Sequence, residues 1–421
     1  MSRYIKENQG STVYDFCRFM LIALTTVSVL CSTLPIVSGY FGSMPQLFVT
    51  LLGFLFLFPI KREYISGWFL TACLALAFFV CQALVRVPDY EFFVSLYMIL
   101  RGVFVVSVTV LFSLRRDYKA MRFLFWVTVI SISITQITTI INIKDDTDLA
   151  RFAITGAAKD NNRSTARLNI GGYTLAYMSP VVTILMYALK KSKIIHPLLL
   201  IAHAVLTVVF IIKVQFTAAL IIYVMVLISL LISRGNLRAL IPVAVSLIIL
   251  GFVLRQPLAN LFEYIAENTD RAAFAERFRD LARAFRGEDL SSSSDISIRL
   301  RAYTTSINTF FKFFLTGSFW NDAKIGKHSA VLDYIAKTGL IGATFLVLMF
   351  KNVYKYTVAP YKGIRNIVLI YFAQVVFFIY AIINVAFYPA QIWILIGLST
   401  AACMMISKKE KETEFNKIKL K

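Results

Sequence analysis

Charged side chains are scarce in this sequence, and their scarcity excludes an ordinary water-soluble protein. Only 16% of the 421 residues are Asp, Glu, Lys or Arg, whereas 58% are hydrophobic. A soluble chain has about a quarter charged residues, because its surface must be solvated. Continuous apolar runs of about 20 residues predict helices that cross a bilayer, and they lack the alternation of an outer-membrane barrel. We therefore expect an all-α polytopic membrane protein.

Cysteine and histidine are also few, which removes several kinds of site. The chain has three His and five Cys, and every cysteine falls inside an apolar run: Cys17, Cys31, Cys73, Cys81 and Cys403. Such positions predict neither a disulfide framework nor a zinc site. The sequence contains no Walker loop and no dinucleotide-binding glycine pattern. We expect no metal and no cofactor.

The apolar runs predict twelve membrane spans, and the first is too long for a removable signal peptide. Their approximate limits are 17–39, 45–60, 66–85, 92–113, 121–142, 171–189, 194–212, 214–233, 239–256, 330–350, 366–386 and 388–406. The connections between them predict six regions: N-terminal membrane helices at 1–142, a first outer loop at 143–170, central membrane helices at 171–256, a large outer loop at 257–329, C-terminal membrane helices at 330–406 and a basic cytoplasmic tail at 407–421.

Acidic residues are outnumbered, with 23 Asp and Glu against 44 Lys and Arg. In a soluble chain this excess would suggest nucleic acid, but beside membrane spans basic residues mark the cytoplasmic side. With both termini inside, the short outer turns hold only Arg86 and Lys213 as cations. We therefore predict an N-in, C-in topology and no nucleic-acid partner, with function in the two long outer loops.

One segment of the large outer loop has an amphipathic pattern. Between residues 270 and 286, Phe274, Phe278, Leu281 and Phe285 recur at helical spacing, and arginines occupy much of the remaining surface. Two interpretations remain open. The helix lies on the outer face of the membrane, or it packs on the helix bundle and keeps a solvated basic face.

His328 is the only histidine predicted on the outer side, immediately before the tenth span. Ser329 is placed to cap that helix. The free N–H groups of a helix N-terminus favour an anion, so a phosphate beside His328 is one interpretation and a solvated loop histidine is the other.

Three short motifs together resemble the O-antigen polymerase and O-antigen ligase superfamily. They are Arg299-Leu-Arg-Ala-Tyr303, His328-Ser-Ala-Val-Leu-Asp333 and Thr338-Gly-Leu-Ile-Gly342. The layout of about twelve spans with one medium and one large periplasmic loop is also similar to that family, whose fold is of the C-type glycosyltransferase kind. The chain departs from the pattern before the Gly317 turn, where the usual proline is absent, and after it, where Ser318-Phe319 replace a second glycine.

The resemblance implies a glycosyltransferase of the bacterial inner membrane that works at the periplasmic face. Its donor would be an oligosaccharide on undecaprenyl pyrophosphate, and it would need neither nucleotide sugar nor metal. The pyrophosphate gains negative charge as it departs, and arginine meets that charge with bidentate donors. The resemblance assigns the clamp to Arg299, with Arg301 beside it. His328 would be the general base for the acceptor hydroxyl, which predicts inversion, or else would bind phosphate itself.

The first outer loop supplies further cations for the same pyrophosphate. Arg167 lies nearest the sixth span, and Arg163 and Arg151 precede it. Contact with anionic lipid headgroups is the alternative interpretation. Asp145, Asp146 and Asp148 could hold a divalent cation or form a solvated loop, and Arg101, inside the fourth span, is either functional or paired within the bundle.

The His-Ser and Leu-Asp motif and Ile170-Gly-Gly-Tyr173 resemble polysaccharide polymerases more than ligases. We therefore expect a polymerase that joins one lipid-linked repeat to another, as in O-antigen or capsule synthesis. The alternatives are a ligase that transfers the glycan to lipid A core and, from another class, a polysaccharide flippase or transporter. Its partners would be the lipid-linked donor and acceptor and the bilayer, and a chain-length regulator is left open.

Overall fold

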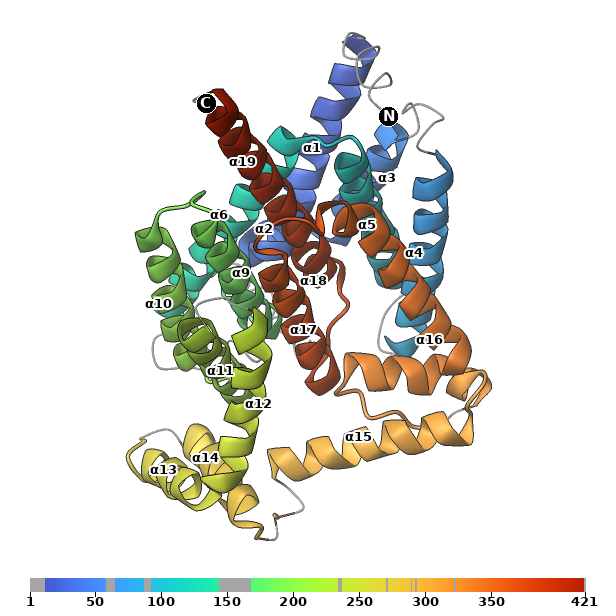
Figure 1. Ribbon diagram of the computed structural model, residues 1–421. Helices are drawn as coiled ribbons and strands as arrows, with labels where there is room; N and C mark the ends of the chain where they lie inside the picture. Colours follow the sequence, from blue (N-terminus) through green and yellow to red (C-terminus); the bar gives the residue numbers. More distant parts are fainter. Residues whose placement is uncertain are drawn as a thin grey trace. The chain divides into compact units, whose positions relative to one another are not determined.

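A computed structural model describes residues 12–57, 65–86, 92–143, 168–233, 237–269, 272–288, 290–291, 294–321 and 323–419. Every regular element in these ranges is helical, which confirms the all-α prediction (Figure 1). Seven helices in the described ranges are long and apolar enough to cross a membrane, and a bent pair makes an eighth if it counts as one span. That pair is α2 (Pro35–Phe41) and α3 (Ser43–Leu57), which meet at 94°.

The chain divides into two compact units, described here one at a time. Unit 1 comprises Met1–Phe210, Thr344–Phe377 and Phe387–Lys421. Besides α2 and α3, it holds α1 (Thr12–Thr33), α4 (Ile65–Arg86), α5 (Phe92–Leu114), α6 (Tyr118–Asn142), α9 (Tyr173–Lys191), most of α10 (Pro197–Val214), the one-turn η4 (Ala359–Tyr361), most of α17 (Ile367–Ile383), α18 (Pro389–Ile392), η5 (Trp393–Leu398) and α19 (Ser399–Lys419).

Unit 2 comprises Ile211–Ala343 and Phe378–Ala386. It holds α11 (Thr217–Ser233), α12 (Leu237–Val253), α13 (Arg255–Glu267), α14 (Ala272–Arg286), α15 (Asp295–Lys312), η3 (Gly317–Trp320) and the first part of α16 (Ala330–Thr357), together with the end of α17 from Phe378 onward. A helix overlaps each of the twelve regions where a span was predicted. All the predicted catalytic and pyrophosphate-binding residues that the structure describes belong to unit 2.

Local sequence explains where several of these helices begin. Asp117 precedes α6 and its carboxylate accepts from the Ala120 N–H at 3.1 Å, and Ser294 precedes α15 and accepts from the Ser297 N–H at 3.1 Å. Each side chain satisfies a donor that the first helical turn leaves open. The long helix α16 is interrupted at Gly339, whose φ of 61° is left-handed. The continuous helix expected from 330 to 350 is therefore two segments.

The structure shows what the apolar face of the amphipathic segment contacts. In α14, Phe278 is buried, and its ring and that of Phe285 lie 5.7 and 5.4 Å from the ring of Phe262 in α13. Ala266 of α13 and Ala275 of α14 complete this small core. The apolar face of α14 thus packs on α13, a neighbouring helix of the same loop, and its position relative to a membrane stays a prediction.

Candidate functional site

The segment between η3 and α16 folds back along α15. The carbonyl of Lys324 accepts from the Thr309 hydroxyl at 2.9 Å, and the Gly326 N–H donates to the Ser306 hydroxyl at 2.8 Å. A Cβ atom on Gly326 would stand 2.2 Å from the carbonyl oxygen of Ala302. Only glycine allows two backbones to approach so closely. We call residues 323–329 the return segment.

The return segment brings His328 toward the end of α15 that carries Arg299. Its contacts move from Thr309 to Ala302 as the chain proceeds, so it runs antiparallel to the helix. Arg299 lies one turn beyond Ala302, about 4.5 Å along the axis at 1.5 Å per residue. His328 follows the Gly326 contact by two residues in the same direction. The return segment therefore leads His328 toward the end of α15 that carries Arg299, although 29 positions separate the two residues in the sequence.

Arg299 and Arg301 do not share this surface. Arg299 is half-buried and lies on the same face of α15 as Ala302 and Ser306, since residues three and seven positions apart stack on a helix. Arg301 is exposed, and two residues turn a helix by about 200°, so Arg301 points to the opposite side. Of the two predicted arginines, only Arg299 faces the return segment.

A buried carboxylate fixes the turn that carries His328. Asp333, with 2% of its surface exposed, accepts from the Ser306 hydroxyl at 2.6 Å and from the Ser329 N–H at 2.9 Å. The Ser329 hydroxyl in turn accepts from the Leu332 N–H at 3.1 Å, which confirms its predicted capping role. The network joins α15, the return segment and α16, so the backbone next to His328 is held on both sides.

The same contacts correct one argument from the sequence. The Ala330 N–H donates to the carbonyl of Asn384 at 3.0 Å, and the N–H groups of Ser329 and Leu332 are already engaged. A helix N-terminus attracts an anion through donors that lack partners. Because these donors at the start of α16 are used within the protein, they are not available to favour a phosphate beside His328.

Arg299 acts on the electrostatics of Tyr303, one turn along α15. Burial raises the pKa of the Tyr303 phenol above its usual value of 10, while the charge of Arg299 and a hydrogen bond from it lower that pKa, and Asp333 raises it. The Tyr303 hydroxyl also donates to the carbonyl of Ile383 at 2.6 Å. Arg299, Tyr303 and the Asp333 turn are therefore close enough to form one polar cluster.

The end of α17 and the residue after it belong to this cluster and were not predicted from the sequence. The carbonyls of Ile383 and Asn384 hold Tyr303 and the start of α16, respectively. The available signal was Asn384 itself, a polar residue near the end of the apolar run predicted at 366–386. A single polar residue at the end of an apolar run does not by itself distinguish a break in the helix from the continuation of a span.

Gly317 and Gly339 form the other end of the arrangement. A Cβ on Gly317 would lie 2.5 Å from the Gly339 nitrogen, and one on Gly339 would lie 2.4 Å from the Gly317 nitrogen. Both residues have left-handed φ angles, 67° and 61°. The Leu340 N–H donates to the carbonyl of Phe314 at 2.9 Å across this crossing. The glycine turn after α15 is thereby fastened to the interruption in α16.

The remaining predicted residues of the first outer loop lie outside the described residues. These are the arginines Arg151, Arg163 and Arg167 and the acidic residues Asp145, Asp146 and Asp148. Their proposed roles stay predictions. Within the ranges that the structure describes, no three His, Cys, Asp or Glu side chains come together as a metal site would require.

Arg101, in α5, is paired within the bundle by neutral groups. Its Nε donates to the Ser28 hydroxyl at 3.1 Å and its Nη1 to Gln46 Oε1 at 3.1 Å. Further hydrogen bonds reach the Tyr97 hydroxyl, the Ser28 carbonyl and the Ser32 hydroxyl. These five acceptors match the five N–H groups of a guanidinium. Arg101 therefore ties α1, α3 and α5 together and has no donor left for a substrate.

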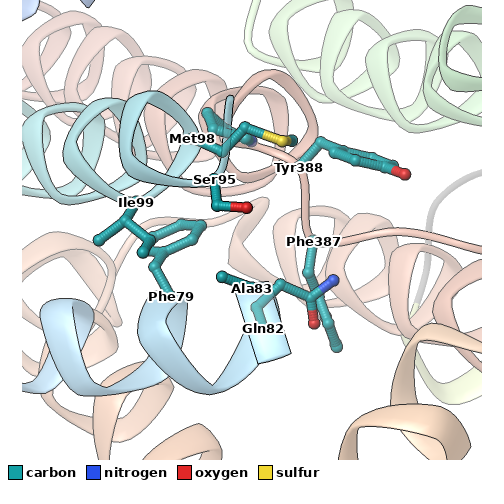
Figure 2. Close-up of a pocket in the computed structure, with 9 residues that line it drawn as sticks. Phe79, Gln82, Ala83, Ser95, Met98, Ile99, Phe387 and Tyr388 are labelled. Carbon is teal, nitrogen blue, oxygen red and sulfur yellow. The ribbon is translucent and has the colours of Figure 1, made fainter. Parts of the chain in front are cut away.

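Unit 1 contains a small cavity of its own. It has a volume of about 20 Å³ and lies between α4, α5 and the start of α18 (Figure 2), lined by Phe79, Gln82, Ala83, Ser95, Met98, Ile99, Phe387, Tyr388 and Pro389. The buried Oε1 of Gln82 has no hydrogen-bond partner among the described residues. Such a space holds one water molecule and is far below the roughly 300 Å³ of a small-ligand pocket. It is not a glycan site.

The chain matches no protein-family model and has no significant match among curated proteins. The cluster of Arg299, Tyr303, His328, Asp333 and Asn384 is thus the candidate site on its own geometry.

Proposed function

We propose that this protein is a polysaccharide polymerase of the O-antigen or capsule type, in the bacterial inner membrane. It would join oligosaccharide repeats carried on undecaprenyl pyrophosphate at the periplasmic face. The observation that supports the proposal most directly is the antiparallel course of the return segment along α15, which leads His328 toward the helix end that carries Arg299. Both residues lie outside the helices that are long and apolar enough to span a membrane. A permanent cation beside a titratable imidazole suits the departure of a pyrophosphate and the activation of a hydroxyl.

In this mechanism the acceptor hydroxyl attacks the anomeric carbon of the donor while the bond to pyrophosphate breaks. His328 takes the hydroxyl proton as general base. Arg299 stabilises the charge that grows on the pyrophosphate oxygens. Direct displacement inverts the anomeric carbon and needs no metal. Arg301 and the loop arginines Arg151, Arg163 and Arg167 remain further candidates for the pyrophosphate.

The proposal includes the N-in, C-in topology with twelve spans. The distribution of basic residues favours it, because cytoplasmic connections retain Lys and Arg. In that topology α13 to α15 and the return segment lie on the periplasmic side, where a lipid-linked repeat is presented after export. In this topology the shorter apolar helices, such as α11 and α17, also cross the membrane, packed against neighbouring helices.

The decisive experiment is polymerisation by the purified protein in lipid vesicles that contain lipid-linked repeats and no other acceptor. We expect ladders of repeats from the wild type, and a loss of about 100-fold or more in rate from His328→Ala and from Arg299→Ala. Lys312→Ala, which changes an exposed cation at the far end of α15, is the matched control and should polymerise normally.

Other outcomes would replace the proposal. Absence of glycan transfer until lipid A core is supplied as acceptor would indicate a ligase. Full-length surface polysaccharide in cells that carry either alanine variant would indicate a flippase or transporter instead.

A further inference from the structure

The side-chain amide nitrogen of Asn384 is a buried hydrogen-bond donor without an acceptor among the described residues. Its backbone N–H donates to the carbonyl of Tyr380 at 2.8 Å, its carbonyl accepts from Ala330 at 3.0 Å, and its Oδ1 accepts from the Val385 N–H at 2.7 Å. The side-chain Nδ2 is buried and meets no acceptor among the described residues. An amide nitrogen carries two N–H donors, so both lack an acceptor within the part of the chain that the structure describes.

The hydrogen bond from Val385 settles which way the amide points. A backbone N–H can only donate, so the atom that it meets at 2.7 Å must be the oxygen of the Asn384 side chain. Nδ2 is therefore directed away from Val385. A buried donor without an acceptor costs free energy, and native proteins keep very few of them. A donor fixed in this way is prepared for a ligand atom that accepts.

The neighbours of Asn384 place this donor beside the candidate site. Ile383, the preceding residue, accepts from the hydroxyl of Tyr303 at 2.6 Å, and Tyr303 lies one turn along α15 from Arg299. Ala330, whose N–H binds the Asn384 carbonyl, follows His328 by two residues. Asn384 is thus held between the segment that carries the arginine and the segment that carries the histidine.

We propose that Asn384 binds substrate directly, by donating hydrogen bonds from its side-chain amide to an oxygen of the lipid-linked glycan pyrophosphate. The inference rests on the proposed function and adds to it a neutral, directional donor. Pyrophosphate oxygens and the sugar oxygens next to them share the required acceptor chemistry. An amide fixes the orientation of such an oxygen without adding charge.

The test uses two substitutions in the full-length protein. Asn384→Asp keeps the oxygen that accepts from Val385 and the size of the side chain, but replaces both donors by an acceptor. Asn384→Ser removes the amide without introducing charge, and its hydroxyl can still accept from Val385. We expect each to lower kcat/KM for polymerisation by about 10-fold to 100-fold, as loss of a substrate donor does. Both variants should keep the thermal unfolding temperature near that of the wild type.

Asn366→Asp is the matched control, because the Asn366 amide already donates to the Ser192 hydroxyl at 2.7 Å, in unit 1. It should polymerise at the wild-type rate. Binding measurements identify the oxygen: weaker binding of undecaprenyl pyrophosphate itself by Asn384→Ser indicates a pyrophosphate oxygen. Weaker binding only of the glycan-bearing lipid indicates a sugar oxygen.

An active wild type with unchanged kcat/KM in both Asn384 variants would overturn the inference and leave the proposed function standing. A wild type that neither polymerises repeats nor binds undecaprenyl pyrophosphate would overturn both.

Discussion

Single side chains of the polar cluster have distinct tasks, and Asp333 is the one whose task is structural. It is buried, and it accepts from Ser306 on α15 and from Ser329 in the return segment. Neither contact reaches outward. Asp333 therefore positions the turn that carries His328. From the sequence alone it was recognised as part of a motif, without a structural role.

Replacing Asp333 should loosen that turn. We expect Asp333→Asn to lower the free energy of unfolding by about 2 kcal/mol, because hydrogen bonds to a charged acceptor contribute more than those to an amide. Denaturation of the purified protein in detergent measures the change. Glu276→Gln, an exposed carboxylate on α14, should stay within about 0.5 kcal/mol of the wild type. Equal stability of the two variants would contradict the structural role of Asp333.

Tyr303 predicts a pH dependence at the alkaline end. Its pKa in the folded protein is raised by burial above the usual value of 10. A raised folded pKa means that the stabilisation is complete below pH 10 and is lost as pH rises through the folded pKa. We expect Tyr303→Phe to lower the free energy of unfolding at pH 8 by about 1 kcal/mol, through loss of the bond to Ile383.

Above pH 10 the wild type should lose stability faster than Tyr303→Phe, and thermal unfolding between pH 8 and 11 measures both slopes. Tyr40→Phe, which removes an exposed hydroxyl, is the control and should follow the wild type. Parallel curves for wild type and Tyr303→Phe would show that Tyr303 does not titrate in the folded state as described.

Pairs of helices are joined by close backbone contacts that only glycine permits. At Gly339 the left-handed φ and the neighbouring Gly317 backbone both exclude a side chain. We expect Gly339→Ala to destabilise the protein by at least about 2 kcal/mol, from strain and displaced backbone. Gly251→Ala is the matched change in α12, where a Cβ meets nothing within 4 Å. It should be neutral or slightly stabilising, and thermal unfolding compares the two.

The buried charge of Arg101 is stabilised by hydrogen bonds to neutral groups of neighbouring helices. Lysine supplies three donors where Arg101 uses five, so Arg101→Lys leaves acceptors on α1 and α3 without partners. We expect a loss of about 2 kcal/mol in unfolding free energy and an unchanged KM for lipid-linked repeats. Arg279→Lys, an exposed change on α14, is the control. A raised KM in Arg101→Lys would instead assign the residue to substrate binding.

The orientation of the whole chain in the membrane can be measured by cysteine labelling. In a variant with its five native cysteines replaced by alanine, Ser291→Cys should react with a membrane-impermeant thiol reagent added to intact spheroplasts. Glu414→Cys, in the exposed end of α19, should react only after permeabilisation. The reverse pattern would place α13 to α15 on the cytosolic side, and would rule out transfer of exported lipid-linked repeats at Arg299 and His328.

The helical, membrane type of the fold was predictable because it depends on composition and local periodicity. Scarce charge and long apolar runs already require backbone hydrogen bonds to be satisfied within each helix. Ser329 was recognisable as a cap for the same reason, since capping involves neighbours in the chain. His328 and Arg299 could be selected as candidates from their motifs, but their spatial relation could not.

Contacts between distant segments were decided only by the tertiary structure. The sequence pattern of α14 does not predict that α13 covers its apolar face. Arg299 and Arg301 carry the same charge, and only the packing of the return segment on one face of α15 distinguishes them. The N–H groups at the start of α16 looked available because Asn384, 54 residues after Ala330, contributes no periodic signal. Local propensities depend on residues a few positions apart in the sequence. The contacts between distant segments depend on which backbones can approach one another, and this is determined only by the packing of the whole chain.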